Sequence, residues 1–372
     1  MARGTEGAVD WEHAARRAAG VVKAGPPIDR PGLEALVGSL RSSAVDAPAY
    51  VADVTGLTEA AERAADGRVL VVDRARWSAA AADTFRAMAG EALPTPRVPG
   101  AARVAGEQLG WALGLLSTRI LGQYDPYVGD GRLLLVAPNV LAVQRQLDAD
   151  AADFHLWVCL HEQTHAVQFA AAPWLGDHLV GVLQDVLRSQ LGGDDDGEHD
   201  GEHGLVPDGA DSAEPHDDDQ ADAAGGGLAG LLSRLTGATR SGTPEVPGLL
   251  AAILPREQQE QLTAAIAVMS LLEGHADVVM DEVGPRAIPT VRSIREAFER
   301  RRDERTLSTL VMRRLLGMDA KLLQYRNGAA FVRGVREQVG HAGLNAVWSG
   351  PEALPTPAEI ADPAAWVTRV HG

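Results

Sequence analysis

The run DFHLWVCLHEQTHAVQFAAAP, residues 153–173, decides how this chain folds around its chemistry. Its centre is HEQTH, residues 161–165, in a stretch with helical periodicity. Residues four apart lie one turn apart on the same helix face, so the imidazoles of His161 and His165 can reach one metal ion. Glu162 is rotated from them by about 100° and can act on a water at that ion without binding the metal.

The helix that carries this pentad is predicted to be buried and to end before Pro173. Apolar residues surround the pentad on several sides: Leu156, Trp157, Val158, Leu160, Val167 and Phe169. Histidines are costly in such a place without partners, which favours metal ligation over a pair of hydrogen-bonded core histidines. We interpret Cys159 as a small core residue and not as a ligand.

A catalytic zinc site needs a third protein ligand, and the run SLLEGHADVVMDEV, residues 270–283, offers one. Glu273 and Asp277 lie four apart on one face of an otherwise apolar helix. We predict that Glu273 binds the metal and that Asp277 accepts the outer N–H of a metal-bound histidine. His275 is the rival ligand, although it points away from Glu273 by about 200°.

Two other interpretations of this acidic pair stay open. Glu273 and Asp277 could be solvated at the edge of a cleft, or Glu273 could pair with an arginine such as Arg313 or Arg314.

Most of the net negative charge of the chain is concentrated in one segment. The net charge is −17, and thirteen Asp or Glu residues without any Lys or Arg lie in residues 194–222, which leaves −4 for the rest. Nucleic acid is therefore not an expected partner. Residues 192–227 are predicted to be a disordered acidic insertion that would suit a basic partner.

The remaining composition predicts a cytoplasmic protein without a membrane-spanning segment. Cys159 is the only cysteine, so no intrachain disulfide can form. The first residues lack the apolar core of a secretory signal, and we expect no apolar run near the roughly 18 residues of a membrane helix.

Helical periodicity predominates, so the expected fold is mainly α with a small β-sheet. The expected helices are residues 10–23, 74–90, 100–121, 151–172, 177–191, 256–282, 289–302 and 305–339, and the expected strands are residues 69–72 and 133–136. We predict an N-terminal helical region, residues 1–130, packed on a catalytic region, residues 131–372, that the acidic insertion interrupts.

HEQTHAVQF followed far downstream by LLEGHADVVMD resembles the gluzincin pattern HExxH plus ExxxD. More closely, the chain resembles a bacterial zincin-like family of zinc-dependent metalloproteases, one branch of which is named for deazaflavin cofactor biosynthesis. The resemblance extends to LGQYDPY (residues 121–127), LLLVAPNV (residues 133–140) and KLLQYRNGAAFVRGV (residues 321–335). It implies a zincin-like fold, one Zn²⁺ per chain, and His161, His165 and Glu273 as its ligands.

The resemblance also implies a zinc metallopeptidase that acts on a peptide or amide bond, with Glu162 as general base. The strand LLLVAP, residues 133–138, is expected to be the sheet edge against which a peptide lies. Candidate donors to the developing oxyanion are Tyr124, Tyr127, His155 and Tyr325. The competing hypothesis is a non-catalytic zinc protein that acts as a scaffold or interaction module.

Overall fold

The computed structural model describes residues 7–90, 92–94, 96, 98–191, 256–303 and 328–372. These residues form many helices around a three-stranded sheet, which confirms the predicted fold class. The acidic insertion, Tyr325 and the two arginines at positions 313 and 314 lie outside the described residues. The domain boundary at residue 130 stays a prediction.

The helices that pack around the sheet come first in the chain. They are α1 (Trp11–Val21), α2 (Arg30–Thr55), α3 (Thr58–Ala65), α4 (Arg74–Ala89), α5 (Ala101–Leu116), α6 (Ala137–Leu147), α7 (Ala151–Ala171) and α8 (Leu175–Leu191). Later in the chain come α11 (Arg256–Ala287), α12 (Val291–Asp303), α14 (Gly328–Leu344), α15 (Pro357–Ala361) and α16 (Pro363–His371), with short 3₁₀ turns at Asn345–Trp348 and Pro351–Ala353. The 26-residue helix α2 is not among the predicted ranges, and it contains Pro48.

Local signals explain where the principal helices begin and end. The side chains of Asp29, Asp73 and Asp150 accept hydrogen bonds from the first-turn N–H groups of α2, α4 and α7, which satisfies donors that have no partner within the helix. Helix α7 ends before Pro173, as predicted, at Ala171, one residue earlier than the expected range, and Ala172 is non-helical. Helix α11 breaks at Gly284 (φ 60°, ψ −164°), directly before Pro285.

The sheet consists of β1 (Arg68–Val72), β2 (Gly122–Asp125) and β3 (Arg132–Val136), in the order β1-β3-β2. Strand β3 pairs with β1 in parallel and with β2 in antiparallel orientation. The expectation that LLLVAP forms the open edge is therefore wrong: this strand is central, and both of its edges are paired. The two edge strands are β1 and β2, and β2, whose sequence GQYD carries no strand-like apolar run, was not among the predicted strands.

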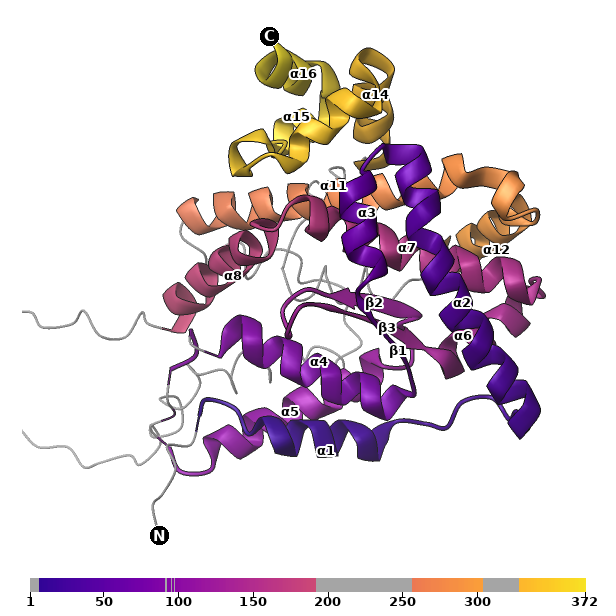
Figure 1. Cartoon of the computed structure of the whole chain (residues 1–372). Coiled ribbons are helices and arrows are strands. Elements are labelled where there is room, and N and C mark those ends of the chain that lie inside the picture. Colours follow the sequence, from indigo (N-terminus) through magenta and orange to yellow (C-terminus); the bar gives the residue numbers. More distant parts are fainter. Residues whose placement is uncertain (1–6, 91, 95, 97, 192–255, 304–327) are drawn as a thin grey trace, which may run out of the picture.

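Alternation along β3 places the sheet between two helical layers (Figure 1). Leu133 and Leu135 pack with residues of α2, α6 and α7, whereas Leu134 and Val136 pack with residues of α1, α4 and α5. Successive strand residues point to opposite faces, so a strand that is apolar throughout must be covered on both sides. A third cluster joins α11 to α14 and the C-terminal helices.

Helix α11, which carries Glu273, crosses the layer that contains α7 (Figure 1) and packs against α7, which carries His161 and His165. Its segment Glu260–Ala287 is long and apolar enough to span a membrane by length and composition alone, contrary to the expectation that no such run exists. Leu271, Ala276 and Val279 on this helix are 0% exposed within the protein. Half of the apolar window of α11 is buried within the protein.

Candidate metal centre

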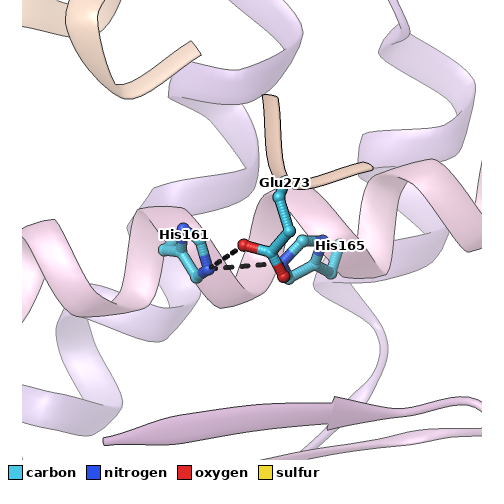
Figure 2. A group of neighbouring side chains, drawn as sticks. All are labelled: His161, His165 and Glu273. Atoms are coloured by element: carbon cyan, nitrogen blue, oxygen red, sulfur yellow. Dashed lines mark hydrogen bonds and ion pairs between the residues drawn. The ribbon is translucent and has the colours of Figure 1, made fainter. Parts of the chain in front are cut away.

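Helix α11 brings Glu273 onto the two histidines of α7 (Figure 2). The Nε2 atoms of His161 and His165 are 3.3 Å apart. The Glu273 carboxylate lies 3.6 Å from Nε2 of His161 and 3.7 Å from Nε2 of His165, through different oxygens. Ligand atoms of the three residues all lie within 4.8 Å of one another. Packing of α11 on α7 therefore brings together ligands that are far apart in the sequence.

These donors suit a zinc ion in both chemistry and spacing. Two nitrogens bound about 2.0–2.1 Å from a tetrahedral zinc lie about 3.3–3.4 Å apart, close to the 3.3 Å between His161 and His165. Two imidazoles and one carboxylate are a known ligand set for catalytic zinc, in which the fourth position is left to water. His161 and Glu273 have 28% and 56% of their side chains exposed, so the centre is open to solvent.

Glu162 lies beside the three donors but is 8% exposed. Burial, followed by the negative charge of Glu273, raises the pKa of Glu162 to about 8, although the backbone N–H of Tyr124 donates a hydrogen bond that lowers it. Near neutral pH this carboxyl group can therefore both hold and release a proton. That property is the one that a general base and acid requires.

A backbone group on the outer edge of β2 contacts Glu162. Val136 donates its N–H to the carbonyl of Leu121. The same register makes Gln123 a hydrogen-bonded partner of Leu134, so the backbone groups of Gly122 and Tyr124 point outward. The outward N–H of Tyr124 is the group that meets the Glu162 carboxylate.

Gln168, which was not predicted as a site residue, contacts the His165 ring nitrogen that faces away from the other donors. The Nδ1 atom of His165 is 2.8 Å from Oε1 of Gln168, and Nε2 of Gln168 donates to the carbonyl of Leu272 at 2.9 Å. The same Nε2 is 3.0 Å from Nδ1 of His275. The spacing of three residues between His165 and Gln168 places both side chains on one face of a helix, and this signal in the sequence could have indicated the contact.

The profile of the zincin-like metallopeptidases matches residues 9–367. This protein belongs to that family. It is also similar to a protein from Chloroflexus aurantiacus whose crystal structure is described as that of a putative hydrolase with a novel fold. The identity is 25% and the TM-score 0.62, over 98% of this chain and 99% of the other. No curated protein matches the chain. The family implies a metal, usually zinc, which agrees with the donors found here.

In this zincin-like protein the rival ligand His275 is not at the centre. It is 0% exposed, and its pKa is lowered to about 3, chiefly by burial and then by the positive charges that His341 and His165 would carry. It lies on the flank of α11 opposite to Glu273, where it contacts Gln168 and meets Trp348 edge-on. Its Nδ1 is bonded to the amide of Gln168, and its Nε2 is buried without a hydrogen-bond partner among the described residues.

Asp277 lies one turn after Glu273, and Arg295 lies close to it. The guanidinium of Arg295 donates to the backbone carbonyl of Asp277 at 3.1 Å and is 4.0 Å from its carboxylate. Because Gln168 already occupies the outer nitrogen of His165, the predicted contact of Asp277 with a metal-bound histidine can concern only His161. That contact stays a prediction.

The predicted oxyanion donors are dispersed. His155 is 3% exposed and contacts Ser39 of α2 at 2.8 Å, so it lies in the α2–α7 interface and not at the metal centre, contrary to expectation. Tyr124 and Tyr127 both pack against Phe169 and line a cavity of about 480 Å³ between α3, α7, α8 and the sheet. Their role toward an oxyanion stays a prediction.

Cys159 is a core residue, as predicted. It is 0% exposed, and its Sγ lies 3.6 Å from the carbonyl of Leu40 on α2. Burial, followed by the charge of Glu162, raises the pKa of this thiol well above its usual range. The side chain therefore stays a neutral thiol, which is a poor metal ligand.

Proposed function

We propose that this zincin-like protein is a zinc-dependent hydrolase that cleaves peptide or amide bonds. The observation that carries the proposal is the position of Glu162: it lies beside a His-His-Glu donor set and contacts the open edge of a strand. A site that only stabilised a fold would have no use for a buried acid in that place.

In this proposal His161, His165 and Glu273 hold the ion. When bound, zinc would polarise a carbonyl and lower the pKa of a coordinated water. Glu162 takes a proton from the attacking water and delivers it to the leaving amine. A pKa of about 8 suits both transfers near neutral pH. Binding of zinc would place a positive charge beside Glu162 and lower that pKa, which favours the base form before attack.

We propose that β2, in place of β3, is the strand along which an extended peptide lies. The outward N–H and carbonyl of Gly122 and the outward carbonyl of Tyr124 can pair with such a peptide, next to Glu162, which accepts the N–H of Tyr124. Because Gly122 has no side chain, Glu162 can approach this strand closely.

Zinc content and peptide hydrolysis, measured on the same preparations, test the proposal. The wild type should contain one zinc per chain, and His161→Ala and Glu273→Ala should lose it or bind it far more weakly. Glu162→Gln should keep zinc and lose hydrolysis of a quenched fluorescent peptide library. Glu282→Gln is the control, because Glu282 lies on α11 but pairs with His341.

The outcomes separate the two functional hypotheses. Zinc binding with peptide cleavage that depends on Glu162 supports the hydrolase. Zinc binding without cleavage of any amide substrate, or cleavage that survives Glu162→Gln, contradicts the mechanism and favours a zinc-containing scaffold. A wild type that binds no transition metal contradicts both.

A further inference from the structure

Gln168 connects the two helices that carry the metal ligands. It is 0% exposed on α7 and forms three polar contacts, one with His165 of its own helix and two with α11. The residue is therefore neither a surface amide nor a space-filling one. Its two polar ends have to be assigned before its effect on the metal centre can be derived.

The carbonyl of Leu272 decides the orientation of the Gln168 amide. A carbonyl oxygen only accepts hydrogen bonds, so the end of the amide that lies 2.9 Å from it must be the NH₂ group. The oxygen end then faces His165, 2.8 Å from Nδ1, and this nitrogen must carry the hydrogen. In a neutral imidazole the other nitrogen, Nε2, then has a free lone pair. Nε2 is the atom of His165 that faces Glu273 and His161.

The second hydrogen of the same NH₂ group is directed at His275. Nδ1 of His275 lies 3.0 Å from Nε2 of Gln168 and can accept this hydrogen. Both contacts of the NH₂ group are with α11, within two residues of Glu273 in sequence. One amide group thus orients His165 and holds in place the segment of α11 that supplies the third donor.

We propose that Gln168, supported by Leu272 and His275, is a positioning residue that fixes the tautomer and ring orientation of His165 and couples the docking of α11 to metal binding. This inference rests on the proposed metal centre. Partners of this kind behind metal-bound histidines typically contribute 10- to 100-fold to metal affinity. Gln168 itself does not touch the metal or the substrate in this proposal.

The chain contains a matched control for Gln168. Gln163 is also on α7, is 2% exposed, and donates its amide hydrogen to the carbonyl of Ala44 on α2 at 2.8 Å. Gln163 therefore bonds to α2, whereas Gln168 bonds to α11. Among the described residues Gln163 makes no hydrogen bond with a proposed metal-binding histidine. Replacement of either glutamine by methionine removes one buried amide group and keeps a side chain of nearly the same length.

The experiment measures zinc affinity by competition with a chelator, and the visible spectrum of Co²⁺-loaded protein, for four full-length proteins. These are the wild type, Gln168→Met, Gln163→Met and Gln168→Glu. Gln168→Met should weaken zinc about 10- to 100-fold. It should also alter the Co²⁺ spectrum, because the His165 ring is no longer fixed. Gln163→Met should lower the unfolding temperature and leave the zinc affinity within about threefold of the wild type.

Gln168→Glu separates the two contacts of the amide. A carboxylate still accepts the hydrogen of His165 but cannot donate to Leu272, so zinc affinity should be retained while the metal-free protein unfolds at a lower temperature. Equal zinc affinity in Gln168→Met and Gln163→Met overturns the inference but leaves the proposed hydrolase intact. A wild type that binds no zinc overturns both.

Discussion

Gly122 lies directly against Glu162. A Cβ atom added to Gly122 would be 2.6 Å from Cγ of Glu162 and 2.9 Å from its Cδ. The same strand donates the N–H of Tyr124 to the Glu162 carboxylate. Close approach of β2 to α7 thus depends on the absence of a side chain at position 122, and the proposed general base depends on that approach.

Gly122→Ala should therefore impair hydrolysis without loss of zinc. The added methyl group must displace either β2 or Glu162, because contacts under 3.0 Å are not tolerated. We expect kcat to fall at least about tenfold, equivalent to about 1.4 kcal/mol of the barrier, with zinc content unchanged. Gly181→Ala on α8 is the control, since a Cβ there meets nothing within 4 Å. Unchanged kcat in Gly122→Ala would show that Glu162 does not need this strand.

The pKa of Glu162 makes the stability of the metal-free protein depend on pH. This pKa is about 8 in the folded state and 4.5 in its unperturbed form, so between these values the folded protein binds more protons than the unfolded one. Stability should therefore fall as pH rises from about 4.5 to 8. Glu162→Gln should flatten this dependence in urea unfolding with a chelator present. A wild-type curve that rises relative to the variant over this interval would contradict the assignment.

Asp125 forms a buried ion pair that anchors the end of β2. It is 0% exposed and accepts hydrogen bonds from Nε of Arg132 at 2.9 Å, Oγ1 of Thr84 at 2.7 Å and the N–H of Tyr127 at 3.1 Å. Asp125→Ala should cost about 3–5 kcal/mol of unfolding free energy, because it leaves a largely buried guanidinium unpaired. Thr84→Val should cost about 1 kcal/mol. Chemical denaturation at pH 7 measures both, and equal effects would show that the ion pair is not decisive.

Helices α1 and α5 meet through glycines. A Cβ on Gly110 would lie 2.6 Å from both the carbonyl oxygen of Ala14 and Cβ of Arg17. Gly110→Ala should destabilise the protein by about 1–3 kcal/mol, despite the helix-forming advantage of alanine. Gly20→Ala in the last turn of α1 meets nothing within 4 Å and should be neutral or stabilising by up to about 1 kcal/mol. Calorimetry should show a lower melting temperature than the wild type for Gly110→Ala, and an unchanged or higher one for Gly20→Ala.

The sequence by itself determined the features that depend on local geometry. Helical pitch places His161 and His165 on one face and Glu162 on its flank, and Pro173 ends the helix. An acid within the apolar run of α11 singled out Glu273, because a carboxylate there needs a partner. The continuous apolar run of β3 also predicted a strand correctly.

Only the tertiary structure decided the features that depend on which elements are neighbours. The strand order made β3 the central strand and left β1 and β2 at the two edges, since backbone pairing forms between strands that are distant in the sequence. The docking of α11 on α7 selected Gln168, and not Asp277, as the partner of His165. The contacts of Gln168 with Leu272 and His275 join helices that are distant in sequence, and such contacts form only when burial of apolar surface brings the helices together.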